Sequence, residues 1–287
     1  MPTEEGARQP ETARRAGVWR RELVLRVGSA VVLVPLALGS AYLGGPVFLA
    51  VWTVAAAIVL WEWTVLVGEP RRAPVVVAIL GFSAAAVLFG VGSPGAGLLV
   101  LAFGALAGSA LSGPGRRTWV LAGAVYAGAM LAAPAILRSD AELGLVAICM
   151  LFGVVWTTDV MAYFVGRGLA GPKLWAAVSP KKTWSGAVGG VAGASLVGAG
   201  LAVLAGLDHI VVLALLCAVL SVAAQAGDLL ESALKRRFGA KDTSGLIPGH
   251  GGLMDRLDGF VVAATAATLL GLLRGGFALP ARGWLIW

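Results

Sequence analysis

The chain has 287 residues, of which 59% are hydrophobic and 13% are charged, with a formal net charge of +7. Soluble globular domains carry about 25% charged residues, so this composition excludes an ordinary soluble protein. Apolar runs of roughly twenty residues recur along the chain, and each is long enough to cross about 30 Å of hydrocarbon as a helix. The sequence therefore predicts an all-α, polytopic integral membrane protein.

The chain is expected to begin with a tail and to continue as about nine transmembrane helices. Residues 1–22 hold Arg, Glu, Pro and Thr with little to bury, which predicts a disordered basic tail. The expected spans are 23–43, 47–67, 74–91, 96–112, 118–137, 143–165, 186–206, 209–227 and 258–275. Most connections are short, but 166–185 and 228–257 are expected to be long loops.

Basic residues alternate between successive connections. The tail and the connections after the second, fourth, sixth and eighth spans carry them, whereas the odd-numbered connections carry only Arg138. The positive-inside rule then predicts a cytoplasmic amino terminus, an outside carboxyl terminus and two cytoplasmic long loops. The basic charge is explained by topology and by anionic lipid head groups, so we expect membrane lipids and not nucleic acid as its partner.

Several acids lie at the edges of the expected spans. Asp228 and Glu231 are three residues apart at the end of the eighth span, and Asp255 and Asp258 repeat that spacing at the start of the ninth. A single acid there could form an ion pair with a nearby cation, but grouped acids at such a costly position are typical of a functional site. Two converging helix ends would gather four carboxylates, which suit Mg²⁺.

Cations and glycines surround these acids, above all in the stretch Lys241–Gly259, KDTSGLIPGHGGLMDRLDG. The interleaved basic residues are Lys235, Arg236, Lys241, His250 and Arg256. Gly249, Gly251 and Gly252 allow the backbone to approach an anion closely. Carboxylates alone would indicate a cation pathway, whereas carboxylates with this many cations indicate a metal ion and a phosphate ester.

The other long loop repeats this pattern. The string SPKKTWSG precedes the seventh span and offers Ser179, Lys181, Lys182 and Thr183 as phosphate contacts at a helix start. Lys181 and Lys182 taken alone would be ordinary topological charge.

Two further acids are weaker site candidates. Asp159 lies within the sixth span. Glu62 lies between Trp61 and Trp63, which are expected to anchor the second span at the membrane interface, and Glu62 itself is expected to face the helix bundle.

At Ser232–Asp258 the chain resembles the phosphatidate cytidylyltransferases, also called CDP-diacylglycerol synthases. The positions that match the family signature are Ser232, Lys235, Arg236, Lys241, Asp242, His250, Gly251, Gly252, Asp255, Arg256 and Asp258. The strings GDLLES (227–232), VSPKKTW (178–184) and AYFVGR (162–167) are also similar to the family.

The resemblance implies a nucleotidyltransferase of phospholipid biosynthesis. Such an enzyme would convert CTP and phosphatidate into CDP-diacylglycerol and pyrophosphate, with one or two Mg²⁺ ions as cofactor. It further implies a homodimer in a bacterial inner or plasma membrane, with the active site facing the cytoplasm. Because the resemblance covers the carboxyl-terminal half, we assign residues 138–287 to a catalytic region and 23–137 to amino-terminal helices.

The resemblance also suggests roles for individual residues. Asp228 and Asp255 are the first-choice metal ligands, followed by Asp258 and Glu231. The residues expected to contact substrate phosphates are Lys235, Arg236, Lys241, Arg256, Ser179, Lys181, Lys182, Thr183, Ser232 and Asp242. His250 would orient a phosphate oxygen or protonate the leaving group.

Three positions depart from the family pattern, namely Val160, Met161 and Ser185. One alternative to a phosphatidate cytidylyltransferase is a CTP-dependent kinase or nucleotidyltransferase that acts on another lipid. A second is an ion-coupled membrane transporter, and a third is an inactive relative. A transporter would spread its acids along a pathway through the bilayer midplane, whereas these acids gather at one face.

Overall fold

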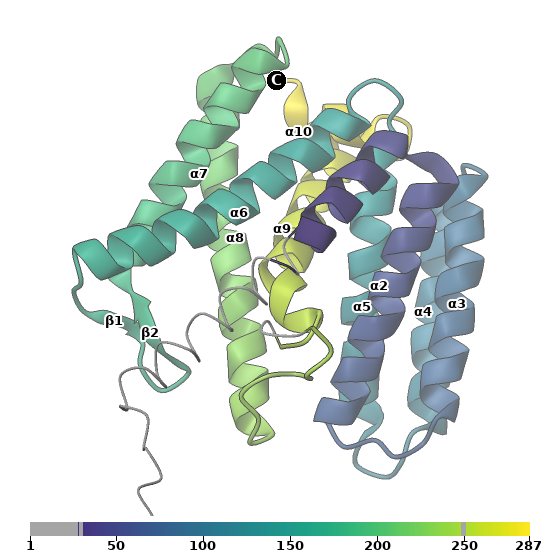
Figure 1. The fold of residues 1–287 in the computed structure, drawn as a ribbon. Helices are drawn as coiled ribbons and strands as arrows, with labels where there is room; N and C mark the ends of the chain where they lie inside the picture. The colour runs from purple at the N-terminus through teal and green to yellow at the C-terminus, as the bar shows by residue number, and fades with distance from the viewer. Residues whose placement is uncertain (1–27, 29–30, 248–250) are drawn as a thin grey trace, which may run out of the picture.

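The computed structural model describes residue 28 and residues 31–247 and 251–287 (Figure 1). Eight helices in these ranges are long and apolar enough to cross a membrane, which confirms the all-α membrane fold. They are α2 (Gly45–Leu66), α3 (Ala73–Gly90), α4 (Pro94–Leu111), α5 (Arg117–Arg138), α6 (Gly144–Gly168), α7 (Trp184–Leu204), α8 (Ile210–Arg237) and α9 (Met254–Gly275).

The first expected span is described only in part, as the apolar helix Val31–Leu43. The expected tail, residues 1–22, lies outside the described residues. Integral membrane character therefore rests on the eight long helices and not on the first span.

Three features outside the predicted spans differ from the sequence prediction. α8 continues to Arg237 and α9 begins at Met254, so the connection between them is shorter than the predicted loop 228–257. The helix continues because Leu234 and Lys235 find buried sites and the final residues are good helix formers. The predicted loop 166–185 contains an antiparallel hairpin, β1 (Lys173–Trp175) and β2 (Ser179–Thr183), and a short helix, α10 (Pro280–Leu285), follows α9.

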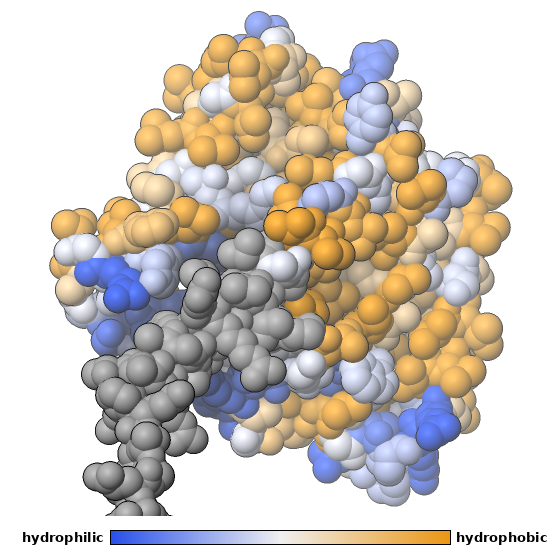
Figure 2. Space-filling view, viewed as in Figure 1, coloured by the Kyte–Doolittle hydropathy of each residue, from blue (hydrophilic) through white to orange (hydrophobic). Residues whose placement is uncertain are grey.

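The arrangement of the helices brings the basic connections to one end of the molecule. Figure 1 shows the α2–α3 and α4–α5 connections, the β1–β2 hairpin and the α8–α9 connection together at the lower end, while the intervening connections lie at the other end. Hydrophobic side chains cover most of the face seen in Figure 2, and hydrophilic ones gather near the hairpin and at the lower right. The alternation of cations along the sequence thus corresponds to two ends of one bundle.

Small residues bring α8 and α9 into close contact. A Cβ added at Gly227 would lie 2.6 Å from the carbonyl oxygen of Asp258, and one added at Gly259 would lie 3.1 Å from that of Ala224. Larger side chains would push the two helices apart. The glycines therefore set the distance between the acids that the two helices carry.

An aromatic stack joins the two halves of the chain. The Trp52 ring of α2 lies 4.9 Å from the Phe260 ring of α9 and 6.5 Å from the Phe152 ring of α6, centroid to centroid. Stacked aromatic rings stabilise a contact beyond the area that they bury. The stack fixes the amino-terminal helices against the helices that carry the acids.

We expect the two ends of the bundle to face opposite sides of the membrane. After replacement of Cys149 and Cys217, single cysteines at Ala176 in the hairpin and Gly239 after α8 should react with an impermeant thiol reagent only from the cytoplasmic side. A cysteine at Asp208, between α7 and α8, should react only from the other side, because the basic connections stay cytoplasmic. Labelling of position 239 from outside in intact cells would contradict this topology.

Candidate active site

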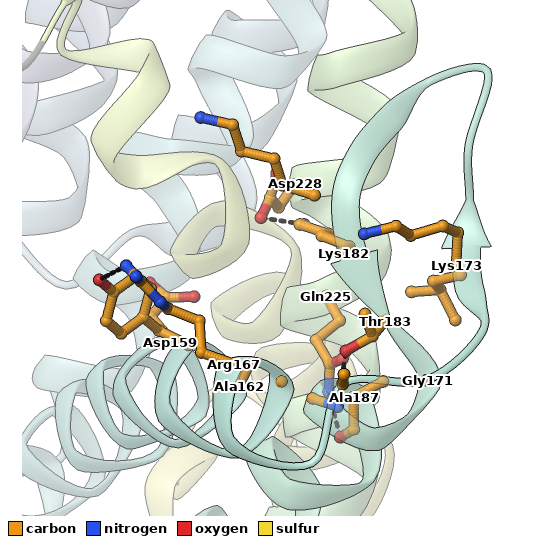
Figure 3. Close-up of a pocket in the computed structure, with 16 residues that line it drawn as sticks. Asp159, Ala162, Arg167, Gly171, Lys173, Lys182, Thr183, Ala187, Gln225 and Asp228 are labelled. Carbon is orange, nitrogen blue, oxygen red and sulfur yellow. Dashed lines mark hydrogen bonds and ion pairs between the residues drawn. The ribbon is translucent and has the colours of Figure 1, made fainter.

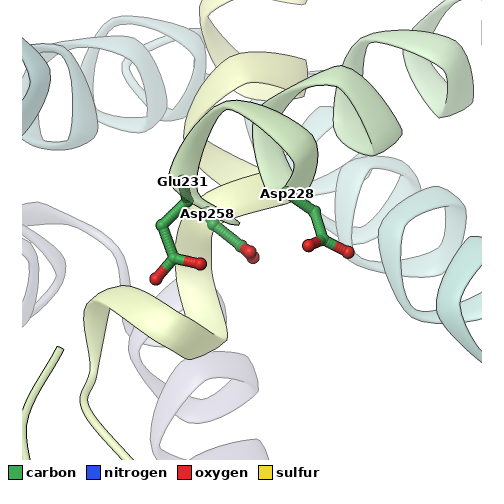
Figure 4. A group of neighbouring side chains, drawn as sticks. All are labelled: Asp228, Glu231 and Asp258. Carbon is green, nitrogen blue, oxygen red and sulfur yellow. The ribbon is translucent and has the colours of Figure 1, made fainter. Parts of the chain in front are cut away.

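Three carboxylates from two helices form a cluster. Ligand atoms of Asp228 and Glu231 on α8 and of Asp258 on α9 all lie within 4.8 Å of one another (Figure 4). Glu231 is only 3% exposed, and its Oε1 has no hydrogen-bond partner in the described parts of the chain. Oxygen atoms so close together repel one another unless a cation lies between them. The donor set fits a hard divalent ion such as Mg²⁺.

Asp255 is not part of this cluster, although the sequence favoured it as a metal ligand. Its Oδ1 accepts a hydrogen bond from Lys235 Nζ at 2.5 Å. Its Oδ2 accepts hydrogen bonds from the Thr243 backbone N–H at 3.0 Å, the Thr243 hydroxyl at 2.9 Å and the Gly252 N–H at 2.8 Å. Asp255 therefore holds the α8–α9 connection in place beside the cluster.

Lys235 is buried between the carboxylate cluster and Asp255. Its ammonium group lies 2.7 Å from Glu231 Oε2 and 2.5 Å from Asp255 Oδ1. The sequence predicted a phosphate contact for Lys235. That contact stays a prediction; in this structure the charge of Lys235 offsets two acids and keeps Glu231 and Asp255 in fixed positions.

Glu62 of α2 is fully buried and holds the start of α9. Its Oε1 accepts hydrogen bonds from the Ser244 hydroxyl at 2.5 Å and the Leu253 N–H at 2.9 Å, and its Oε2 accepts one from the Met254 N–H at 2.7 Å. The first N–H groups of a helix have no partner within the helix, and the helix dipole favours a negative charge there. Sequence reasoning rated Glu62 as a weaker candidate, and its only signal was an acid within an apolar span.

The glycine pair of the signature is required by this packing. A Cβ at Gly252 would lie 2.1 Å from the Thr243 hydroxyl and 2.6 Å from Glu62 Oε1. Gly251 has φ of +82°, in the left-handed region that favours glycine. These glycines let the backbone pass between Glu62 and Asp255. The anion contact expected from the sequence stays a prediction, and Gly249 lies outside the described residues.

A cationic cavity of about 560 Å³ lies between α6, the hairpin, the start of α7 and α8 (Figure 3). Its cationic lining residues are Arg167, Lys173, Lys181 and Lys182. Lys182 forms an ion pair with Asp228, which also lines the cavity. The cavity therefore reaches the carboxylate cluster.

The cavity also explains the positions of Asp159 and Thr183. Asp159 lines it from α6 and interacts electrostatically with Lys182 and with Arg256 of α9. Thr183 also lines the cavity and caps the start of α7, where its Oγ1 accepts a hydrogen bond from the Gly186 N–H at 3.2 Å. Sequence reasoning missed Arg167 and Lys173 as site residues, although Arg167 ends the AYFVGR string.

The remaining candidates lie around these features. Lys241, Asp242, Arg236 and Arg256 are exposed, and Ser179 lies half-buried in β2. Ser232 Oγ lies 3.4 Å from Asp228 Oδ1, and Arg236 Nη1 donates to the Ala240 carbonyl oxygen at 2.9 Å. His250 lies outside the described residues.

Fold and site together define a helical membrane protein in which a cationic cavity reaches clustered carboxylates, the type of site that suits a metal ion and a phosphate. The chain belongs to the cytidylyltransferase family, whose model matches residues 24–273. This confirms the resemblance at Ser232–Asp258 and the expectation of a nucleotidyltransferase.

Several curated proteins are similar to the chain. A phosphatidate cytidylyltransferase of Brucella abortus biovar 1 (strain 9-941) is 40% identical over 270 residues, which cover 90% of this chain and 95% of that protein. One of Bacillus subtilis (strain 168) is 42% identical over 126 residues, or 44% of this chain and 47% of that protein. One of Staphylococcus haemolyticus (strain JCSC1435) is 40% identical over 134 residues, or 46% of this chain and 50% of that protein.

We predict that Glu62→Gln lowers activity about 10-fold or more without preventing folding. The NH2 group of Gln cannot accept a hydrogen bond, so at least one buried donor at the start of α9 loses its partner. That loss costs about 1–3 kcal/mol and loosens the start of α9. Activity of the purified variant and its thermal stability in detergent are the measurements.

Glu69→Gln is the matched control. Glu69 is also buried and also holds two connections, since it accepts hydrogen bonds from the Arg71 N–H at 3.0 Å and the Gly113 N–H at 2.8 Å. A similar loss of stability with nearly normal activity is expected for Glu69→Gln. Equal activity losses in the two variants would mean that Glu62 has only a general structural role.

Proposed function

We propose that this protein transfers the cytidylyl group of CTP to phosphatidate, forming CDP-diacylglycerol and pyrophosphate. The observation that carries the proposal is the cationic cavity that reaches three clustered carboxylates through the Lys182–Asp228 ion pair. The names of the similar proteins support the two substrates.

The carboxylate cluster is the proposed metal site. Asp228, Glu231 and Asp258 would hold one or two Mg²⁺ ions, and the unpartnered Glu231 Oε1 supports this assignment. A bound ion would neutralise charge on the phosphoryl group undergoing displacement. Asp255, with one oxygen paired with Lys235 of α8 and the other hydrogen-bonded by the connection, would act by positioning and not by ligation.

The cationic cavity is the proposed site for the triphosphate of CTP. Arg167, Lys173 and Lys181 line it and supply fixed positive charge, which offsets the repulsion between a nucleotide and an anionic lipid. The same cations would stabilise the negative charge that pyrophosphate gains on leaving. Lys241 and Arg256, exposed at the same end, would add to this charge.

The proposed reaction is a direct in-line displacement. A phosphate oxygen of phosphatidate attacks the α-phosphorus of CTP, the new oxygen–phosphorus bond forms, and the bond between the α-phosphorus and its bridging oxygen to the β-phosphate breaks. Phosphatidate is already anionic at neutral pH, so no strong general base is needed. His250 would orient a phosphate oxygen or donate a proton to the leaving group.

We also propose that the enzyme lies in the bacterial inner or plasma membrane, with this site facing the cytoplasm, and that it acts as a homodimer. CTP is a cytoplasmic nucleotide, and the positive-inside rule places the cationic end there. A transporter is a weaker proposal, because the described carboxylates cluster beside cations near one end of α8 and α9.

The direct test uses the purified protein in detergent with CTP, Mg²⁺ and phosphatidate. Formation of lipid-linked cytidine and pyrophosphate in equal amounts is expected. Other acceptors, such as polyprenol and diacylglycerol, serve as comparisons. Transfer only to one of those alcohols would replace the proposal with a CTP-dependent lipid kinase, and no product with any acceptor would favour an inactive relative.

We predict that Asp228→Asn and Asp258→Asn each lower kcat/KM about 100-fold or more. Asn keeps the size of the side chain but removes the charge that attracts the ion, so Mg²⁺ binding should weaken more than stability. Mn²⁺ binding followed by electron paramagnetic resonance measures the site without turnover. The double variant should be little worse than either single one, because both residues act on one metal site.

Asp208→Asn is the control for this pair, because Asp208 is exposed between α7 and α8 at the other end of the bundle. Asp140 is less suitable, since it is buried and accepts hydrogen bonds from the Glu142 and Leu143 N–H groups at the start of α6. Unchanged Mn²⁺ binding in Asp228→Asn and Asp258→Asn would overturn the metal site.

Lys181→Ala and Lys241→Ala are predicted to raise the KM for CTP about 10-fold, since each removes one fixed cation near the nucleotide phosphates. Arg72→Ala is the matched control, because Arg72 is an exposed cation in the α2–α3 connection, at the same end but outside the cavity lining. Steady-state kinetics with varied CTP measure the effect. Equal changes in all three variants would indicate topological charge only.

A further inference from the structure

A second cavity, of about 620 Å³, lies between α2, α5, α8 and α9. Its lining is almost wholly apolar, and includes Trp63, Ala122, Ala129, Leu234 and Leu269. Glu231 lines this cavity, whereas Asp228, one turn earlier on α8, lines the cationic cavity. Two cavities of opposite character therefore share the carboxylate cluster.

The apolar cavity has a polar end. Tyr126 and Glu231 both line it, and the Tyr126 hydroxyl and Glu231 Oε1 are buried without a hydrogen-bond partner among the described residues. Buried polar atoms are nearly always hydrogen-bonded. The proposed metal ion accounts for Glu231 Oε1, so the Tyr126 hydroxyl is the atom that a polar group of a further ligand would complete.

The outer side of the cavity is lined by exposed apolar side chains. Val125 of α5, Leu230 of α8 and Leu269 of α9 line it and are 57%, 59% and 57% exposed. All three belong to helices that are long and apolar enough to span the membrane. A molecule in the bilayer could therefore enter from the side without crossing a polar layer.

We propose that this cavity binds the glycerol backbone and one acyl chain of a phospholipid, with its phosphate at the carboxylate cluster. This rests on the function proposed above, in which the acceptor is phosphatidate. The occupant must be apolar along most of its length and must end in polar groups near Glu231, and a phosphate-bearing diacyl lipid meets both requirements. A helix of a second copy would cover the exposed side chains but would not supply polar groups to Tyr126 and Glu231.

Kinetics with a filled cavity give the first test. Ala122 is exposed and lines the cavity, so Ala122→Trp should occupy it without disturbing the core, and the KM for phosphatidate should rise about 10-fold while that for CTP stays within about 2-fold. Tyr126→Phe should raise the same KM about 3- to 10-fold, the usual effect of one lost hydrogen bond.

Ala192→Trp is the matched control, because Ala192 is an exposed alanine of the spanning helix α7 that does not line the cavity. It should leave both KM values unchanged. An equal rise in the KM for phosphatidate in Ala122→Trp and Ala192→Trp, or a rise for CTP alone, would overturn the proposal.

Photolabelling separates this inference from the proposed reaction, because it needs no turnover. Phosphatidate with a diazirine on one acyl chain, added without CTP, should label peptides of α5, α8 and α9, and unlabelled phosphatidate should compete. Labelling that unlabelled phosphatidate reduces would support lipid binding in this cavity, even if the wild-type protein forms no CDP-diacylglycerol. Labelling elsewhere only, labelling without competition, or efficient disulfide formation between Val125→Cys residues of two fully active copies would overturn it.

Discussion

Three carboxylates held close together between membrane-spanning helices are the constraint on which this structure depends. Carboxylates in a low-dielectric region are costly, and their mutual repulsion adds to that cost. The contact of α8 with α9 at Gly227 and Gly259 forces Asp228, Glu231 and Asp258 together nevertheless. Lys182 and Lys235 approach the cluster from the hairpin and from α8 itself, so positive charge offsets part of the repulsion. A cation at the proposed metal site would relieve the repulsion that remains.

The segment between α8 and α9 is held by acids rather than by regular secondary structure. Asp255 accepts hydrogen bonds from Thr243 and Gly252, and Glu62 accepts them from Ser244 and the first residues of α9. Hydrogen bonds to charged groups are stronger than neutral ones, and burial strengthens them further. These hydrogen bonds hold residues 243–244 and 252–254 next to the cluster.

Much of this organisation could be predicted from the sequence. Long apolar runs predict helices because the bilayer leaves the backbone no other way to satisfy its hydrogen bonds, and the i, i+3 spacing placed Asp228 and Glu231 on one face of α8. The same spacing did not show that Asp255 turns to the connection while Asp258 turns to α8. That choice depends on the donors of Thr243 and Gly252, whose positions follow from the tertiary fold.

Other features had weaker signals in the sequence. The β1–β2 hairpin is short and its strands are not clearly alternating, so hydropathy gave no sign of it. The role of Glu62 depends on a contact across 191 residues, and local patterns carry no information on such a contact. The sequence predicted that Glu62 faces the helix bundle, and its complete burial agrees with that, but the donors that it meets could not be predicted.

The contact between Glu62 and the start of α9 has a consequence for the modular exchange of parts between related proteins. The resemblance to the family is densest after residue 137, which suggests a self-contained carboxyl-terminal unit. However, Glu62 and Trp52 belong to α2, and they complete the helix start and the aromatic stack of that unit. A chimaera joined near residue 137 would take the carboxylates of α8 and α9 from one parent protein. It would take Glu62 and Trp52, which position α9, from the other. The amino-terminal helices are thus an internal scaffold, and they can be swapped only together with the surface that they complete.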